Sequence, residues 1–201
     1  MPKASFKLVA LAAAFIIAVA AGVVVDGQRK RRDAEDLFKT VRSFVVGATT
    51  LSAAQKELQQ FGKYRNMGIA CDMSDCTLGF DVTNKSLKFL HLASPVEVGT
   101  TLRFSSNMLQ YKTMNITGGT FNVVYITESD PPPNARVWPP KIYRDKTGVV
   151  WKALIHITPQ STSQERAVLD SFNFRCLTKI GGCTTGEEMA PAVSQIVSGS
   201  Q

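Results

Sequence analysis

The sequence has little from which a catalytic site could be assembled. It holds two histidines in 201 residues, and it lacks the G-x-S-x-G, G-x-x-x-x-G-K-[ST], H-E-x-x-H and G-x-G-x-x-G motifs. His91 lies in an apolar segment and His156 on a predicted strand, and neither has an identifiable carboxylate or nucleophile partner, so we interpret both as structural. The sequence therefore predicts no enzyme activity, no cofactor and no metal site.

Acidic residues are almost absent from the first 32 positions, which changes the meaning of the net charge of +7. Six lysines and arginines stand there beside one acid, Asp26, and this leaves 17 basic and 15 acidic residues for the rest of the chain. Nucleic-acid binding requires clustered basic residues on the folded surface, whereas the excess here adjoins an apolar segment. We therefore exclude nucleic acid as a partner.

Charged residues are also missing from residues 8–25 (LVALAAAFIIAVAAGVVV). At ~1.5 Å rise per residue, this segment spans roughly 27 Å as a helix, close to the ~30 Å of bilayer hydrocarbon. A cleaved secretory signal is one alternative, because Lys3 and Lys7 make a basic start and positions 18–20 resemble a cleavage site. A buried core helix is another, but a helix that is apolar all round would need a large protein to bury it. The run exceeds the ~7 to 15 apolar residues of a signal peptide, so we favour a retained anchor that contacts the lipid bilayer.

A basic cluster follows the apolar run and consists of Arg29, Lys30, Arg31 and Arg32. Anionic lipid headgroups attract such residues by ~1 kcal/mol each, so we expect the cluster at the membrane surface. The positive-inside rule counts these residues and favours a cytoplasmic domain.

The cysteines favour the opposite orientation. They form two close pairs, Cys71 with Cys76 and Cys176 with Cys183. Disulfides persist in oxidising compartments and are rare in the cytosol. We give the cysteines more weight and predict a single-pass membrane protein whose domain is extracytoplasmic, in a bacterial periplasm.

Four cysteines allow three connectivities. Local bridges are favoured, because turn-forming residues separate the members of each pair, including Gly181 and Gly182 in the second. A structural zinc site is an alternative, but the second pair is spaced more widely than zinc ligands usually are. A thioredoxin-like redox centre is another, but neither pair is C-x-x-C.

Helical periodicity continues after the apolar segment. Leu37, Val41 and Phe44 share one face of a helix predicted over 33–45, which would extend the membrane helix as a stalk. A second helix is expected to begin at a capping box on Ser52 and to stop at Gly62.

The middle of the chain has the period of two that is typical of strands. We expect short helices over 163–171 and after Thr185, and segment 86–92 fits a helix or a strand. The predicted fold is α+β, with an N-terminal transmembrane helix, a helical segment, an antiparallel sheet and short C-terminal helices. Strands are expected over 76–82, 101–105, 109–116, 120–127 and 149–158, with turns at 106–107 and 118–119.

Residues 130–145 contain five prolines together with Trp138 and Tyr143. Proline restricts the backbone, so we expect an extended loop between the last two predicted strands. Prolines and aromatic side chains suit partner grooves, which makes Trp138 and Tyr143 candidates for a partner-binding loop. The alternative is a long hairpin connection in which Trp138 folds back onto the domain.

The chain divides at three places. Residues 1–32 form the N-terminal tail, anchor and basic flank, and 33–66 form the stalk and second helix. Residues 67–190 form the sheet domain with both cysteine pairs, and 191–201 are expected to be a flexible tail.

A local resemblance adds to this reading. The stretch Phe44-Val45-Val46-Gly47-Ala48-Thr49-Thr50, followed by Ala54, Leu58 and Gly62, resembles a segment of small bacterial envelope proteins of the SmpA/OmlA type. The resemblance implies helices packed on an antiparallel sheet and an accessory role in outer-membrane protein assembly. The chain departs from that type because it has no lipobox cysteine and carries four cysteines elsewhere. Its layout also resembles bacterial envelope proteins with one N-terminal span and a four-cysteine domain.

These observations favour a membrane-anchored extracytoplasmic domain that acts by binding, with a structural or assembly role and another envelope protein as partner. A membrane-tethered enzyme or thiol-redox protein is the alternative from a different class. A third hypothesis is a cytoplasm-facing regulator with reduced cysteines.

Overall fold

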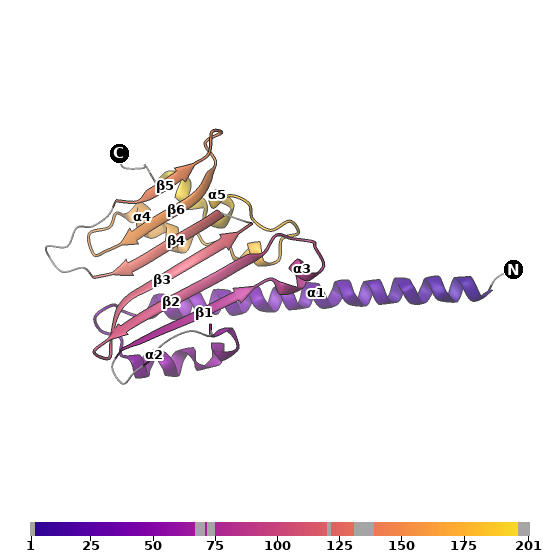
Figure 1. Ribbon diagram of the computed structural model, residues 1–201, viewed down its shortest axis with the longest axis horizontal. Helices are drawn as coiled ribbons and strands as arrows, with labels where there is room; N and C mark the ends of the chain where they lie inside the picture. Colours follow the sequence, from indigo (N-terminus) through magenta and orange to yellow (C-terminus); the bar gives the residue numbers. More distant parts are fainter. Residues whose placement is uncertain (1–2, 67–70, 72–74, 120–121, 131–138, 197–201) are drawn as a thin grey trace.

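A computed structural model of the chain describes residues 3–66, 71, 75–119, 122–130 and 139–196. One long helix, α1 (Lys3–Ser43), is followed by a six-stranded sheet and short helices (Figure 1). The N-terminal half of α1 projects beyond the domain, and its C-terminal half crosses one face of the sheet (Figure 1). The predicted α+β fold is confirmed.

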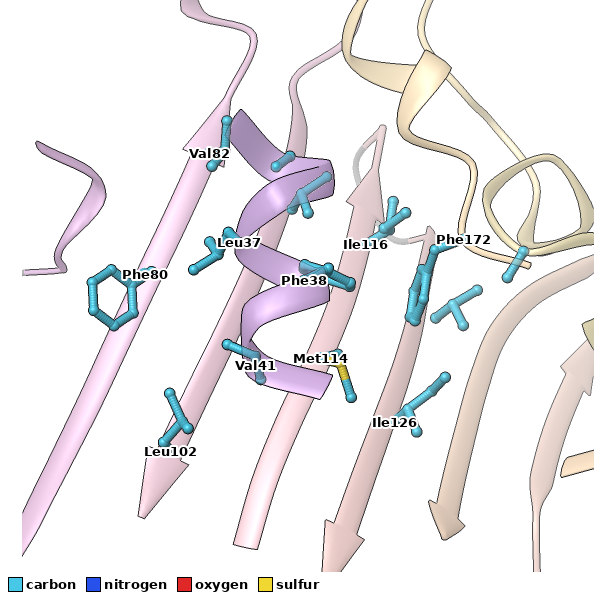
Figure 2. Packing of buried hydrophobic residues seen from close by; sticks show 14 of the residues in the cluster. Leu37, Phe38, Val41, Phe80, Val82, Leu102, Met114, Ile116, Ile126 and Phe172 are labelled. Carbon is cyan, nitrogen blue, oxygen red and sulfur yellow. The ribbon is translucent and has the colours of Figure 1, made fainter. Parts of the chain in front are cut away.

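The second half of α1 belongs to the core of the domain. Ala34, Leu37, Phe38 and Val41 recur at the spacing of one helix face, and all four are buried. The side chains of Leu37, Phe38 and Val41 face the sheet (Figure 2). We expected a stalk here, but the apolar face of this segment is matched by the apolar face of the sheet, so the two pack together.

A short helix, α2 (Leu51–Leu58), follows α1 and lies beside the first strand (Figure 1). Its N-cap is Thr50, whose hydroxyl accepts a hydrogen bond from the amide of Ala53, so the expected cap at Ser52 is wrong by two residues. The chain continues from α2 into a 3₁₀ helix, Gln59–Tyr64. Gly62 lies inside that 3₁₀ helix and does not end α2.

The sheet has the order β1-β2-β3-β4-β6-β5. Its first four strands form the antiparallel meander expected from the sequence. The turn between β2 and β3 has positive φ at both Ser106 (51°) and Asn107 (64°), as a two-residue hairpin requires. The strands are β1 (Cys76–Thr83), β2 (Val96–Ser105), β3 (Met108–Gly118), β4 (Asn122–Ser129), β5 (Lys141–Arg144) and β6 (Val150–Ile157).

Two features of the sheet differ from the prediction. β4 and β6 are parallel, so the sheet is mixed and not wholly antiparallel. The segment between them, predicted as a loop over 130–145, contains β5, which pairs with β6 as an antiparallel hairpin. The carboxylate of Asp145 accepts hydrogen bonds from the amides of Thr147 and Val149 and thereby forms the hairpin turn.

The C-terminal elements cover the same face of the sheet as α1 (Figure 1). Phe38 of α1 contacts Phe172 and Phe174 edge to face, at ring-centroid distances of 5.2 and 5.0 Å. Residues 191–196 of the expected flexible tail belong to the fold, because Val193 and Ile196 are buried, and 197–201 lie outside the described residues. The elements are α4 (Ser163–Asp170), a 3₁₀ helix Phe174–Leu177, α5 (Gly186–Met189) and a 3₁₀ helix Pro191–Gln195.

Candidate binding surfaces

The projecting half of α1 has the composition and exposure of a membrane segment. Its most apolar window of 18 residues has a mean hydropathy of 2.3, and 6% of that window is buried. Phe15 is 71% exposed and Val25 is 68% exposed. Among the residues described, this is the one helix long and apolar enough to cross a membrane.

The domain contacts α1 where its apolar run ends. The hydroxyl of Ser86, on α3 (Lys85–Phe89), donates a hydrogen bond to the carboxylate of Asp26. The Nζ of Lys30 donates to the same carboxylate over 2.6 Å. One turn of α1 is also close to Thr178, whose Cγ2 would lie 3.4 Å from a Cβ added at Gly27. Two separate parts of the domain therefore dock at one level of α1.

An apolar groove of about 440 Å³ lies between α1 and these two parts of the domain. On the α1 side its lining recurs every four residues, which makes a single stripe of the helix. The groove is lined by Phe15, Ile16, Val19, Ala20, Val23, Val24, Gly27 and Gln28 of α1, and by Leu87, Leu90, Leu92, Thr178 and Ile180 of the domain.

Large apolar side chains are exposed in and beside this groove: Leu92 and Ile180 line it, and Phe89 precedes the lining residue Leu90 in the chain. Phe89 is 81% exposed, Ile180 is 73% exposed and Leu92 is 44% exposed. Lys85 and Lys88, on the same short helix as Phe89, are exposed as well. We call Phe89, Leu92, Ile180, Lys85 and Lys88 the membrane-proximal surface.

The disulfide between Cys176 and Cys183 closes the loop that carries Ile180, and its Cα atoms are 5.2 Å apart. Within the loop, the amide of Gly181 donates a hydrogen bond to the carbonyl of Leu92 over 2.8 Å. Positive φ at Gly181 (85°) and Gly182 (72°) gives the loop a backbone shape that other residues rarely adopt. The loop and the segment after α3 are therefore held together.

Glu188 holds the same loop from the other side. Its carboxylate accepts a hydrogen bond from Lys179 Nζ over 2.5 Å and another from the amide of Thr184 over 2.7 Å. The Lys179 hydrogen bond, followed by that of Thr184, lowers the pKa of Glu188 below its ordinary value of 4.5. The loop is thus fixed by charge-assisted hydrogen bonds as well as by its disulfide.

The basic cluster of residues 29–32 is partly compensated within α1. Lys30 pairs with Asp26, and Arg31 Nε lies 2.7 Å from Glu35 Oε1. Arg29 and Arg32 are exposed. The positive charge that faces solvent is therefore smaller than the sequence run indicates.

The second disulfide, Cys71 to Cys76, lies at the start of β1, with Cα atoms 4.1 Å apart. Both bridges are the local ones predicted from the sequence. The Cys76 and Cys176 side chains are fully buried, and Cys183 is 1% exposed.

The second candidate surface is the face of the sheet opposite α1, which no described helix crosses (Figure 1). Tyr111, Tyr125 and Trp151 are 37%, 36% and 37% exposed. Tyrosine and tryptophan are enriched in protein interfaces, because they bury large rings and keep a polar atom available. We call this the open face.

A shallow pocket of about 420 Å³ lies on the open face. Tyr125 and Leu154 pair across β4 and β6 at its centre, and Leu154 also pairs with Lys141 of β5. His156 Nε2 lies 2.6 Å from Ser129 Oγ at its edge. The pocket is lined by Tyr125, Thr127, Pro139, Lys141, Leu154, Ile155 and His156.

Asp81 on β1 and Glu97 on β2 form an acidic strip, which β3 separates from this pocket and which was not found from the sequence. Gly99 lies between Asp81 and Asn115 in register, and a Cβ on Gly99 would lie 2.7 Å from Asp81 Oδ1 and 2.8 Å from Asn115 Oδ1. Burial raises the pKa of Asp81, and the hydrogen bond from Asn66 opposes this shift without cancelling it. Burial and the charge of Asp81 raise the pKa of Glu97. The sequence clue to this strip was one glycine within a strand, and a glycine alone does not identify such a strip.

The predicted partner-binding loop is only partly described. Trp138 lies outside the described residues. Tyr143 lies on β5, where its ring packs against Trp151 at 5.6 Å and under Lys152 Nζ at 5.7 Å. Tyr143 is therefore an element of the strand pairing at the sheet edge, close to the open-face pocket.

The two histidines of the sequence lie on different parts of the domain. His91 is exposed, at positive φ (56°) after α3, and His156 Nε2 on β6 lies 2.6 Å from Ser129 Oγ. Among the described residues no three histidine, cysteine or carboxylate side chains are placed to hold a metal ion.

Searches for similar proteins found no matching family, no matching curated protein and no matching solved structure.

Proposed function

We propose that this chain is a membrane-anchored binding domain whose folded part lies on the extracytoplasmic side of the membrane. The observation that carries the proposal is the continuity of α1 from an exposed apolar half into a buried core half. Because the anchor is also a core element, the domain is held in one orientation relative to the membrane. A flexible tether would not provide this.

Two disulfides support the extracytoplasmic side of the proposal. Cys176 and Cys183 are both buried, and in the other bridge Cys76 is buried and Cys71 is exposed. Disulfides persist in oxidising compartments and are rare in the cytosol. The basic cluster of residues 29–32 favours the opposite orientation by the positive-inside rule, which counts basic residues regardless of their ion pairs. A cytoplasm-facing regulator is therefore the second candidate.

The open face is the surface by which the domain would bind. Of its exposed aromatic residues Tyr125 lines the pocket, and the acidic strip lies on the same sheet, on β1 and β2. The axis of α1 runs along the sheet (Figure 1), so in a membrane the open face would look sideways along the bilayer. This orientation suits a partner anchored in the same membrane, such as another envelope protein.

Site-specific photo-cross-linking in intact cells tests the binding role. A photoreactive residue at Tyr125 should give a cross-linked product of defined mass, and Leu154→Glu should abolish it without changing the amount of folded protein. The matched control places the photoreactive residue at Lys56, which is exposed on α2. Equal products at both positions, or none at Tyr125, would contradict binding through the open face.

Thiol labelling separates the binding role from a thiol-redox role. Structural disulfides should stay unlabelled in the native protein and accept label only after reduction and unfolding. A cysteine pair that cycles between forms and has a low thiol pKa would favour the redox alternative.

A further inference from the structure

We infer that the membrane-proximal surface inserts into the bilayer, so that lipid acyl chains fill the groove beside α1 and contact Phe89, Leu92 and Ile180. The inference rests on the proposed membrane anchor and adds a second, peripheral contact of the folded domain with the same membrane.

The depth of the groove along α1 is the first argument. It follows α1 from Phe15 to Gln28, while the apolar run ends at Val25. The segment from Phe15 to Val25 extends about 15 Å along a helix, which is about half the hydrocarbon thickness. Leu90 and Ile180 line the same groove, whose α1 wall lies mostly within the apolar run.

If residues 8–25 of α1 span the membrane, these domain residues are therefore held at the bilayer. The Ser86 to Asp26 hydrogen bond and the close approach at Gly27 fix the domain against α1 at the end of the run. Transmembrane helices tilt by ~20° on average, and a tilt toward α3 brings this surface deeper. The fixed attachment leaves the surface in the interfacial region of the leaflet on the domain side.

The chemistry of the surface is the second argument. Phe89 and Ile180 are more than two-thirds exposed and Leu92 is 44% exposed, which would leave three large apolar side chains in contact with water. Their neighbours Lys85 and Lys88 have long apolar stems and charged ends that reach anionic headgroups from a partly buried helix. Apolar tips flanked by lysines are typical of surfaces that lie in the membrane interface.

The occupant is thereby identified as lipid. The groove has one wall made of the anchor itself, so it is continuous with the surface that lipid already covers. A second copy of the chain, or an apolar segment of another protein, would have to displace lipid from this stripe of α1.

Depth-dependent fluorescence quenching tests this inference on the full chain. Trp138 and Trp151 are replaced by phenylalanine, and one tryptophan is introduced as Phe89→Trp, Ile180→Trp or, as control, Tyr111→Trp on the open face. Each protein is reconstituted into phosphatidylcholine vesicles that contain a minority of phosphatidylglycerol, with or without bromine on the upper acyl chain. The first two proteins should lose fluorescence in brominated vesicles, and the control should keep it.

The other outcomes are distinguishable. If the protein stays in the vesicles after an alkaline wash but Phe89→Trp is quenched only by aqueous acrylamide, the insertion is wrong and the anchor stands. If neither lipid bromine nor acrylamide quenches Phe89→Trp, a protein covers the surface and the lipid occupant is wrong. If the alkaline wash releases the protein, the anchor itself fails, and the inference fails with it.

Discussion

Lys112 Nζ lies 2.6 Å from the carbonyl oxygen of Phe44 and thereby joins β3 to the C-terminal end of α1. The same ammonium donates to the carbonyl of Arg42 over 3.1 Å and pairs with Glu128 Oε2 at 3.2 Å. Lys112 is 1% exposed. A cation at this place satisfies carbonyl groups that the end of a helix leaves without partners, and it matches the helix dipole. The anchor helix is thus fixed to the sheet by a buried charge as well as by apolar packing.

Replacing Lys112 should loosen that attachment. Lys112→Met leaves Glu128 and the α1 carbonyls without their donor, so we expect a loss of about 2 to 4 kcal/mol in the free energy of unfolding. The measurement is urea denaturation of the full chain in detergent micelles, followed by circular dichroism. The control is Lys152→Met on the open face, expected to change stability by less than about 0.5 kcal/mol.

A double variant separates the ion pair from the carbonyl contacts. Lys112→Met combined with Glu128→Gln should recover part of the loss, because the uncompensated carboxylate is removed. Equal stability of Lys112→Met and the unmodified chain would show that the buried lysine does not hold α1.

Gly118 should tolerate no side chain. A Cβ there would contact the backbone carbonyl of Cys183 and Cε of Met189. Gly118→Ala therefore forces β3 away from the disulfide loop and should reduce stability by roughly 1 to 3 kcal/mol. Gly62→Ala is the matched control, because nothing lies within 4 Å of its added Cβ. Similar melting temperatures for the two variants would contradict the close packing of β3 on the loop.

The lowered pKa of Glu188 makes its stabilising effect depend on pH. Because the folded state favours the ionised carboxylate, the contribution is present above the ordinary pKa of 4.5 and is lost as the pH falls through the lower, folded pKa. Glu188→Gln should therefore be less stable than the unmodified chain at neutral pH, and the difference should disappear in acid. A difference that does not vary with pH would contradict this role of the charge.

Glu97 should behave with the opposite sign. Burial and the neighbouring charge of Asp81 raise its pKa, so ionisation of Glu97 opposes folding, and stability falls as the pH rises from the ordinary pKa through the raised one. Glu97→Gln should be more stable than the unmodified chain at neutral pH and equal to it in acid. Thermal melts at a series of pH values measure both glutamates in one experiment. Destabilisation by Glu97→Gln at neutral pH would contradict the claim that ionisation of Glu97 opposes folding.

The disulfide between Cys176 and Cys183 should stabilise the loop that carries Ile180. The loop is short, with a sequence separation of 7, so the chain-entropy effect of the bridge is about 2 to 2.5 kcal/mol. Replacing both cysteines by serine should lower stability by that amount and expose the loop to proteases first. Limited proteolysis with mass spectrometry locates the cleavage, and cleavage outside 176–183 would contradict the prediction.

Much of the fold could be predicted, because local patterns determine it. The periodicity of Leu37 and Val41 gave the helix, the alternation after Cys76 gave the first strand, and Ser106-Asn107 gave the hairpin. What the helix packs against is not local, so the core position of 33–43 could not be distinguished from a stalk.

The candidate surfaces depend on contacts between distant parts of the chain. Neither Phe89 nor Ile180 indicates a surface when taken alone in the sequence. They belong to one surface because the hydrogen bond between Leu92 and Gly181 brings their segments together. β5 could not be recognised from the sequence, because the prolines before it obscure strand patterns. The four residues of β5 follow the last of these prolines. The pocket on the open face likewise exists only through the parallel pairing of β4 and β6.

A topology reporter after Gln201 tests the central claim most directly. Full-length fusions to alkaline phosphatase and to green fluorescent protein report opposite sides of a bacterial inner membrane. The account predicts phosphatase activity without fluorescence, in a membrane fraction that resists alkaline extraction. Fluorescence without phosphatase activity would place the domain in the cytoplasm and would contradict the extracytoplasmic binding domain proposed here.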